Sequence, residues 1–465
     1  MKKLCVIGGA GARSAFLTKS LVKSARDIQV DRIVLLDNDA LHLRTYGEIS
    51  RQIAARLDPA LDFQVTDDPR EALSGADYII TTIRAGGEAG RLFDEETCLA
   101  RGVLGQETTG AGGFAMAIRS VPTLLYYCGL AREIANPGHL IFNFTNPSGI
   151  ITQALRLRGF GNVYGICDAP SGFIRNLEGL LGAEPGELEI ECYGLNHLSW
   201  FRNARFRGKD VQELLAKDPR AYTATEMRFF TPEMARLSGG ELLNEYLYFY
   251  YRRVRSLSMI QAAERPRGRM IAEINAGLEE RLAQLKLPEQ FQEGFDLYMA
   301  AYGQRENAYF SVESGTRRER AWVPPTVEEF LSAPDEGGYA AVALRFIRAV
   351  TEGVPCRMVL SVPNNGAIHG LRDDDVVEIT CDIREDGAHP VPIGEIDEFQ
   401  LQQIRRLKYF ERCTIQAILE NDRDAAVKGL FLHPLVNDLE LAEELAGIFF
   451  DKYAEFLHMG QPVHG

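Results

Sequence analysis

The first half of the chain alternates short apolar runs with longer stretches in which apolar residues recur at helical spacing. Apolar runs bounded by turn-forming residues are typical of buried strands, and the helix-length stretches between them predict crossover connections. The predicted strands cover residues 4–7, 33–37, 78–82, 140–143 and 163–167. Helical segments are expected at residues 15–23 and 121–135, among others. This alternation predicts a parallel, doubly wound sheet.

The second half mixes strand patterns with long helices and predicts a C-terminal mixed α/β domain. We expect strands at residues 188–193, 357–362 and 376–382, and helices at residues 396–420 and 439–457. No stretch rich in Pro and Gly marks the junction, which we place between residues 190 and 191. The expected domains are therefore residues 1–190 and 191–465, packed closely against each other.

Composition narrows the classes of partner. The chain has 465 residues, a formal net charge of -14 and 46% hydrophobic residues, enough for two domains with substantial cores. The acidic excess argues against nucleic acid or an anionic membrane surface as a partner. The opening Met1-Lys2-Lys3 leads into a strand-like run, so we expect no signal peptide, no membrane span and a cytoplasmic location. The eight cysteines lack paired spacing and are expected to be mostly free, buried thiols.

A glycine-rich turn at residues 8–14 follows the first predicted strand. Glycines between a strand and a helix let the backbone approach a pyrophosphate at the helix N-terminus, so Gly9 and Gly11 are candidate nucleotide contacts. Ser14 stands where the usual fingerprint has a third glycine. Asp37, at the end of the second strand, can accept hydrogen bonds from an adenosine ribose, which favours NAD over NADP. The alternatives are a turn that binds no nucleotide and an aspartate that only caps the next helix.

Arg84 follows the strand expected at residues 78–82, at the edge of the sheet where ligands usually bind. Its guanidinium can clamp an anionic group through paired N–H donors. The alternative is an ion pair with Asp94 or Glu95. Two further polar segments follow apolar stretches and can serve as site loops or only as helix caps: residues 105–110 and 143–148.

Cys167 and Asp168 end the last predicted strand of the first half, and His197 comes just after the next one. A thiolate and an imidazole can hold a transition metal while leaving coordination positions open for substrate oxygens. Asp168 could carry a proton to or from a leaving group. The alternatives are a packed thiol, a structural histidine and a turn-forming aspartate.

A run dense in tyrosines spans residues 245–251. On a helix, Tyr246 and Tyr250 would share a face. A phenol can act as a base when nearby cations lower its pKa, and three arginines lie close in sequence: Arg252, Arg253 and Arg267. Core packing is the alternative interpretation of such an aromatic stripe.

Seven segments, taken together and in order, resemble glycoside hydrolase family 4, the NAD- and divalent-metal-dependent glycosidases. They are the glycine turn with Asp37, Ile83-Arg84-x-Gly86-Gly87, Gly105-Gln106-Glu107-Thr108, Asn143-x-Thr145-Asn146-Pro147, Gly165-Ile166-Cys167-Asp168, Gly194-Leu195-Asn196-His197 and Pro363-Asn364-Asn365-Gly366-Ala367-Ile368. The resemblance runs almost end to end. It implies an N-terminal Rossmann-like domain with a C-terminal mixed α/β domain.

The resemblance also implies roles for individual residues. Cys167 and His197 would ligate Mn2+ or another divalent ion, Asp168 would act as acid, and Tyr246 matches the base position best, with Tyr250 left open. Substrate contacts would come from three further residues: Arg84, Asn146 and Arg267. The implied chemistry is hydrolysis by a redox route, which differs from the common two-carboxylate mechanism. The sugar would lose hydride from C3 to NAD and a proton from C2, eliminate the aglycone, add water and regain the hydride.

The implied substrate is a small-molecule glycoside carrying a 6-phosphate, and the implied assembly is a homodimer or homotetramer. Asp168 after the metal cysteine resembles the 6-phospho-α-glucosidases. Residues 169–172 and the pair Tyr248-Phe249 depart from the usual pattern of phospho-sugar members, which leaves both the anomer and the phosphate open. The alternatives are a family member acting on unphosphorylated glycosides, an NAD-dependent dehydrogenase of the lactate/malate type, and a non-catalytic NAD-binding sensor.

Overall fold

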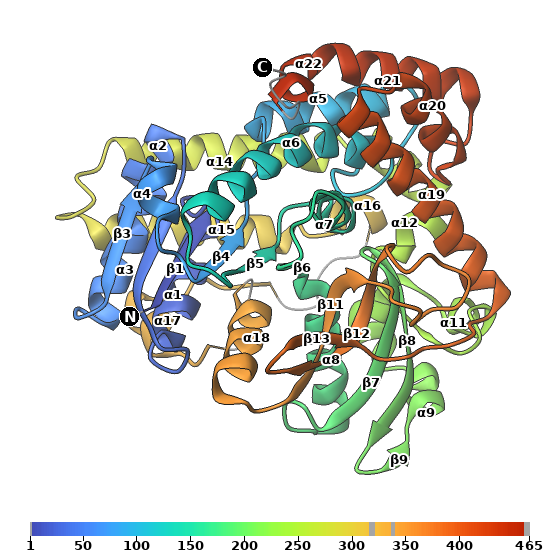
Figure 1. The fold of residues 1–465 in the computed structure, drawn as a ribbon, viewed down its shortest axis with the longest axis horizontal. Helices are drawn as coiled ribbons and strands as arrows, with labels where there is room; N and C mark the ends of the chain where they lie inside the picture. Colours follow the sequence, from blue (N-terminus) through green and yellow to red (C-terminus); the bar gives the residue numbers. More distant parts are fainter. Residues whose placement is uncertain (1, 316–320, 336–339, 460–465) are drawn as a thin grey trace.

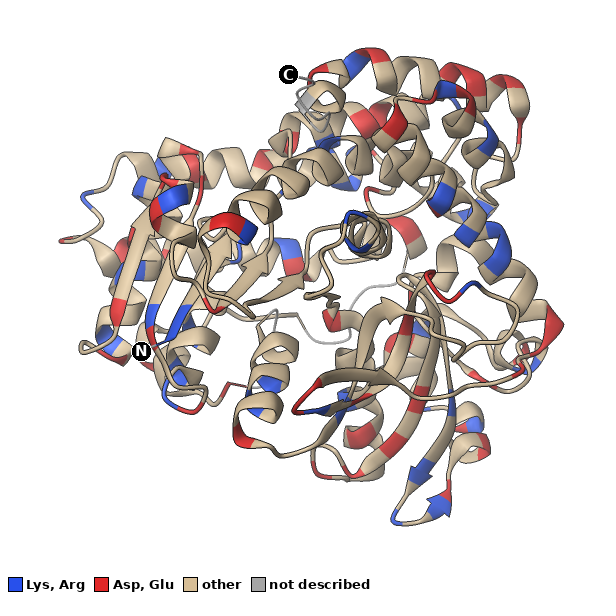
Figure 2. Ribbon diagram, in the orientation of Figure 1, with Lys and Arg blue, Asp and Glu red and all other residues tan. Residues whose placement is uncertain are grey.

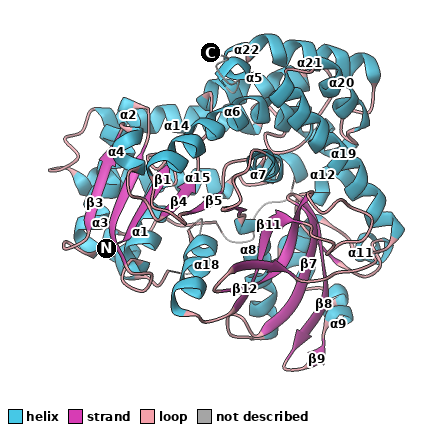
Figure 3. Ribbon diagram, viewed as in Figure 1, coloured by secondary structure: helices cyan, strands magenta, loops and turns pink. Residues whose placement is uncertain are grey.

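The computed structural model describes residues 2–315, 321–335 and 340–459. A large sheet runs through the middle of the molecule and helices cover it (Figures 1 and 3). Its strands are β1 (Lys2–Ile7), β2 (Val30–Leu36), β3 (Asp62–Thr66), β4 (Tyr78–Thr81), β5 (Leu140–Asn143), β6 (Val163–Gly165), β11 (Cys356–Pro363), β12 (Val376–Arg384) and β13 (Gly387–Pro390).

Within the described residues this sheet has nine strands in the order β13-β12-β11-β6-β5-β4-β1-β2-β3. The six N-terminal strands are parallel, and their order reverses between β1 and β4. In such a sheet, ligands bind at the carboxyl ends of the strands where the order reverses. The predicted Rossmann-like doubly wound sheet is confirmed.

Helices fill both faces of the parallel part because each crossover between parallel strands must pack its apolar side onto the sheet. They are α1 (Ser14–Ser24), α2 (Ala40–His42), the π-helical turn η1 (Leu43–Gly47), α3 (Glu48–Leu57), α4 (Pro69–Leu73), α5 (Gly87–Leu99), α6 (Gly110–Ile134), α7 (Ser148–Leu157) and α8 (Asp168–Leu181).

A smaller antiparallel sheet follows, in the order β10-β8-β7 with β9 paired to β8. Its strands are β7 (Leu188–Leu195), β8 (Leu198–Phe206), β9 (Lys209–Asp210) and β10 (Leu242–Leu243). The helices around it and beyond it are α9 (Gln212–Lys217), α10 (Ala221–Ala224), the 3-10 turn η2 (Glu226–Phe229), α11 (Pro232–Leu237), α12 (Leu247–Tyr251), α13 (Arg253–Ala262), α14 (Arg267–Ala283), α15 (Phe291–Asn307), α16 (Ser311–Ser314), α17 (Val327–Ser332) and α18 (Ala341–Glu352).

The chain ends in a group of helices at the upper right of Figure 1: α19 (Glu398–Glu420), α20 (Arg423–Leu432), α21 (Leu439–Lys452) and α22 (Ala454–Met459). The helix expected at residues 439–457 is interrupted at Tyr453, whose hydroxyl donates to Asp94 Oδ1 at 2.5 Å. Acidic and basic residues are interspersed along these helices (Figure 2). The predicted mixed α/β second part is confirmed.

Helix α6 begins at Gly110, well before the expected start at residue 121. Its first turn is rich in glycine and therefore has low helix propensity, so the pattern of apolar residues did not predict a helix there. The glycines are needed for close packing, since a Cβ on Gly112 would lie 2.4 Å from Gln106 O. Among the described residues, α6 is the one helix long and apolar enough to cross a membrane, but 72% of its apolar window is buried inside the structure. It is therefore the core helix of this fold.

The eight cysteines are free, and six of them are buried, as expected. The last three strands of the large sheet lie beyond the expected domain boundary at residues 190/191, so both parts of the chain contribute to one sheet. The boundary itself stays a prediction.

The two parts of the large sheet meet where Ser361 of β11 pairs with Gly165 of β6. A Cβ on Gly165 would lie 2.6 Å from the Ser361 Cβ and 2.7 Å from the Thr152 Oγ1. Side chains do not approach each other that closely, so the sheet can be continuous here only if residue 165 is a glycine.

We expect Gly165→Ala to lower the free energy of unfolding by about 1–3 kcal/mol, because the added methyl overpacks this junction. The measurement is thermal or urea unfolding of the purified chain. Gly179→Ala is the matched control, since Gly179 lies in α8 with no atom within 4 Å of the added Cβ. That change should stabilise by up to ~1 kcal/mol through helix propensity. Equal unfolding midpoints for the two variants would contradict the packing argument.

Candidate active site

A cavity of about 1260 Å3 opens at the carboxyl ends of the parallel strands. Its wall is formed by the loops after β1, β2, β4, β5 and β6, by the β7–β8 turn, and by helices α12, α14 and α15. It brings together every site residue expected from the sequence: Gly9, Gly11, Asp37, Arg84, Asn146, Cys167, Asp168, His197, Tyr246 and Arg267. Tyr250 does not line this cavity.

The glycine turn after β1 is packed tightly against β2. Gly8 N and Gly9 N both donate to Leu36 O, at 2.8 and 3.0 Å. A Cβ on Gly9 would lie 2.9 Å from the Leu35 Cβ, whereas one on Gly11 would meet nothing closer than Gly8 O at 3.9 Å. Gly9 thus serves the close packing of the turn, and Gly11 leaves backbone open towards the cavity. This arrangement fits the pyrophosphate of a dinucleotide at the start of α1.

Asp37 joins the glycine turn to the end of β2. Its Oδ2 accepts from Ala10 N at 3.2 Å and its Oδ1 accepts from Asp39 N at 3.1 Å. The N-cap of α2 is Asp39, which accepts from Leu41 N and His42 N. The alternative that Asp37 only caps the next helix is therefore wrong. A carboxylate has acceptor sites beyond these two bonds, so Asp37 retains capacity for ribose hydroxyls.

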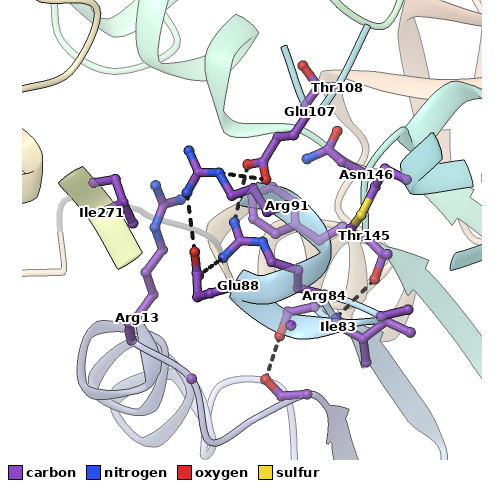
Figure 4. A pocket seen from close by; sticks show the side chains of 18 of the residues that line it. Arg13, Ile83, Arg84, Glu88, Arg91, Glu107, Thr108, Thr145, Asn146 and Ile271 are labelled. Carbon is purple, nitrogen blue, oxygen red and sulfur yellow. Dashed lines mark hydrogen bonds and ion pairs between the residues drawn. The ribbon is translucent and has the colours of Figure 1, made fainter. Parts of the chain in front are cut away.

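Arg84 belongs to a cluster of two arginines and two glutamates on the cavity wall (Figure 4). Its Nη1 lies 2.6 Å from Glu88 Oε1, and its Nη2 lies 3.2 Å from Glu107 Oε1. Arg91 reaches the same two carboxylates at 3.7 and 3.3 Å. Burial raises the pKa of Glu107, but the two arginines outweigh it and hold that pKa at about 2.

The alternative partners considered for Arg84, Asp94 and Glu95, are wrong. Asp94 instead forms a fully buried ion pair with Arg119, which also donates from Nη1 to Ala85 O at 2.5 Å. The Tyr453 hydroxyl donates to the other Asp94 oxygen. This buried group lies directly behind the Arg84 loop and fixes its backbone. Nothing in the spacing of these residues along the chain indicated it.

Cys167 and His197 come from different sheets but meet in the cavity. Cys167 is the N-cap residue of α8, two residues after β6 ends, and His197 lies in the two-residue turn between β7 and β8. The Cys167 Sγ lies 3.9 Å from His197 Nε2. Because metal–sulfur and metal–nitrogen bonds are about 2.3 and 2.1 Å long, one ion can contact both atoms.

The donor set fits a divalent ion with open coordination positions. Burial lowers the pKa of His197 to about 3, so the imidazole is neutral and its lone pair is available. Its Nδ1 is buried without a hydrogen-bond partner in the described part of the chain. Burial, then Glu378 and Asp168, raise the pKa of Cys167, so a thiolate there requires a cation beside it. The described residues hold no group of three or more such ligands, which excludes a closed structural site among them.

Tyr246 stacks on His197 with ring centroids 3.7 Å apart and planes 14° apart. It is the N-cap residue of α12 and has helical backbone angles, with φ of -69° and ψ of -19°. The Tyr250 hydroxyl lies 2.5 Å from Thr109 Oγ1. Burial raises the pKa of Tyr246 well above its usual value, with Glu245 and Cys167 adding to the effect.

The expectation that nearby arginines would lower the pKa of Tyr246 is wrong, because burial raises that pKa. Arg252 and Arg253 are exposed. Arg267 does reach the cavity. Its Nη1 donates to Ala308 O at 2.9 Å, and its guanidinium lies over the Tyr309 ring.

Asp168 lies in the first turn of α8, beside Cys167, and burial raises its pKa. A raised pKa favours the protonated carboxyl, which is the form that can donate a proton. Asn146 reaches the same cavity from the loop after β5.

Several residues that line the cavity were not predicted from the sequence. Arg305 and Glu306 come from α15, and Asn275 and Glu279 come from α14, two helices without a recognisable motif. Glu88 did carry a signal, since it stands four residues after Arg84, the spacing of ion pairs on a helix.

The chain matches the model described as "Family 4 glycosyl hydrolase" over residues 3–183 and that described as "Family 4 glycosyl hydrolase C-terminal domain" over residues 192–436. It is 28% identical over 462 residues to the 6-phospho-beta-glucosidase BglT of Thermotoga maritima, covering 98% of this chain and 100% of that one. It is 26% identical over 465 residues to the phospho-alpha-glucosidase PagL of Clostridium acetobutylicum, covering 96% of each.

Solved structures agree with these matches. The Thermotoga maritima 6-phospho-beta glucosidase with NAD and glucose-6-phosphate superimposes with a TM-score of 0.80 at 28% identity, covering 98% of this chain and 99% of that one. The same enzyme with manganese, NAD+ and glucose-6-phosphate gives a TM-score of 0.79 at 27% identity, over the same shares of the two chains.

Proposed function

The chain belongs to family 4 of the glycosyl hydrolases, and from this membership we propose that it hydrolyses 6-phospho-glucosides with the help of NAD and a divalent metal ion such as Mn2+. One observation carries the proposal. The Cys167–His197 pair lines the same cavity as the glycine turn and Asp37, so a metal-bound sugar and a dinucleotide can share one site.

The dinucleotide contacts are Gly9, Gly11 and Asp37, and the metal ligands are Cys167 and His197. When bound, NAD+ supplies a hydride acceptor for C3 of the sugar, and the divalent ion supplies a Lewis acid for the sugar oxygens. The solved structures of the Thermotoga maritima 6-phospho-beta glucosidase hold NAD, manganese and glucose-6-phosphate, which supports this choice of cofactors and a phosphorylated substrate.

Two residues handle protons. Tyr246 takes the proton from C2, which is supported by its place on the cavity wall and by the stacking of its ring on His197. Asp168 gives a proton to the leaving oxygen at C1, because its burial favours the protonated form. Elimination of the aglycone is followed by addition of water, so the net reaction is hydrolysis.

Arg84, Asn146 and Arg267 bind the substrate. An anionic sugar needs such arginines because the protein as a whole carries a net charge of -14. The Arg267 guanidinium is held by Ala308 O and the Tyr309 ring, and the Arg84 guanidinium is held by two carboxylates. Both are thus oriented before a phosphate arrives, which lowers the entropy cost of binding it.

A cytoplasmic location accords with the buried free thiols, which suit a reducing compartment. We also propose that the chain assembles as a homodimer or a homotetramer.

The central experiment is an assay of para-nitrophenyl α- and β-glucosides, each with and without a 6-phosphate, in the presence of NAD+ and Mn2+. We expect nitrophenol release from one 6-phosphorylated anomer, with no lasting NADH absorbance because the net reaction is hydrolysis. Chelation of the metal or removal of NAD should reduce turnover to background.

Accumulation of NADH in proportion to substrate would instead indicate a lactate/malate-type dehydrogenase. Hydrolysis of the unphosphorylated glycosides alone would contradict the phosphate assignment while leaving the family chemistry intact. Binding of NAD without any turnover on the four substrates would contradict the enzyme proposal.

Removing only the hydroxyl of Tyr246 tests its role as the base. Tyr246→Phe keeps the ring against His197 and removes the proton acceptor, so we expect turnover and uptake of solvent deuterium at C2 to fall by roughly 10²–10⁴-fold, the usual contribution of a general base. Tyr250→Phe is the control and should retain C2 exchange, since its hydroxyl faces Thr109 outside the cavity. The measurement is mass spectrometry of product formed in D2O. Loss of exchange in the Tyr250 variant with exchange preserved in the Tyr246 variant would reverse the assignment.

A further inference from the structure

A buried carboxylate on strand β12 of the large sheet holds the turn that carries His197. Glu378 lies in β12 and is 1% exposed. Its Oε1 accepts from Asn196 Nδ2 and its Oε2 accepts from Ser199 Oγ, both at 2.9 Å. These two donors stand immediately before His197 and two residues after it, so the carboxylate clamps the turn from both sides.

The turn needs such a clamp. His197 has a φ of +65°, a left-handed backbone conformation that is uncommon outside glycine. The hairpin is also closed tightly, because a Cβ on Gly194 would lie 2.3 Å from Leu198 O. A strained residue keeps its conformation only where the surrounding contacts impose it.

The same network extends to Tyr246. Ser199 Oγ donates to Glu378 and accepts from Asn244 Nδ2 at 3.1 Å. Asn244 Oδ1 in turn accepts from Tyr246 N at 3.0 Å. Burial raises the pKa of Glu378, and the two hydrogen bonds that it accepts oppose this effect. The ionised carboxylate can only accept, so in that form it sets the direction of each bond in this chain. One side chain therefore orients both the His197 imidazole and the ring stacked on it.

We propose that Glu378 is a positioning residue for the metal site, which holds His197 and Tyr246 in place through Asn196, Ser199 and Asn244. The inference rests on the proposed function, since it assumes that Cys167 and His197 ligate the ion. Loss of a group that orients a metal-ligating side chain typically lowers metal affinity by ~10–100-fold. Both hydrogen-bond partners of Glu378 are neutral, so a cation at Cys167 and His197 would also give this buried carboxylate a favourable charge partner.

Glu378→Gln tests the positioning role with little change of shape. The amide offers one acceptor and one donor where the carboxylate offers two acceptors, so one of the two bonds must break or reverse its direction, which disturbs the chain of bonds through Ser199 and Asn244. We expect the dissociation constant of Mn2+, measured by the electron paramagnetic resonance signal of free Mn2+ on the full chain, to rise by ~10–100-fold. The visible spectrum of the Co2+-loaded protein should change as the imidazole shifts.

The matched control is Glu241→Gln. Glu241 also accepts from two neutral donors, the Tyr193 hydroxyl at 2.6 Å and Gln400 Nε2 at 3.2 Å, but it does not line the cavity. We expect this variant to bind Mn2+ as the parent does. An equal loss of affinity in both variants would overturn the inference, because loss of any hydrogen-bonded carboxylate would then have the same effect.

Cys167→Ser separates failure of this inference from failure of the proposed function. If the parent chain and Cys167→Ser bind Mn2+ equally, the metal site itself is wrong. If Cys167→Ser loses binding and Glu378→Gln keeps the parent affinity, the positioning role alone is wrong. Should Glu378→Gln not fold, Ser199→Ala removes one of the two clamps, and an unchanged Mn2+ affinity in that variant likewise overturns the proposal.

Discussion

The pairing of β11 with β6 is the contact on which the site depends. It occurs where Ser361 faces Gly165, at a separation that no side chain on residue 165 could tolerate. Two residues later the chain reaches Cys167, so the same contact that joins the two parts of the sheet also sets the position of the thiol. Beyond β11 lies β12, from which Glu378 reaches the His197 turn and Thr380 Oγ1 accepts from Cys192 N of β7. The sulfur and the imidazole are therefore aligned through one continuous sheet rather than through a flexible interdomain contact.

The two parts of the chain contribute different residues to the cavity. The parallel strands present their carboxyl ends together, so the glycine turn, Asp37, Arg84 and Cys167 converge at one edge of the sheet. The antiparallel hairpin β7–β8 supplies the imidazole of His197 beside the Cys167 thiol, on a turn of two residues. A rigid turn costs strain at His197, and the buried bonds of Glu378 offset it.

The parallel sheet was open to prediction because each of its buried strands is bounded by turn residues, and residues 140–143 coincide with β5. Features that depend on tertiary pairing could not be predicted from the sequence. The glycine-rich start of α6 contradicts local propensity and is explained only by the closeness of Gln106. An ion pair of Arg84 with Asp94 or Glu95 was the alternative interpretation, yet Asp94 pairs with Arg119 of another helix. Glu378 carried no signal at all, because its role exists only through the residues that the sheet places beside it.

The charges of the cavity wall show how an acidic chain can accept an anionic sugar. Arg84 and Arg91 share Glu88 and Glu107, so the four groups are close to neutral as a set, and neither guanidinium is buried alone. The carboxylates hold the Arg84 donors in a fixed direction when no ligand is bound. On the proposed function, a phosphate oxygen can take up a donor now directed at Glu88 or Glu107, with similar geometry and charge. A neutral sugar hydroxyl cannot replace a carboxylate in this way, because breaking the ion pair would leave a charge without a counterpart. Discrimination in favour of phosphorylated sugars then arises from the ion pairs that the ligand must displace, as well as from the contacts that it makes.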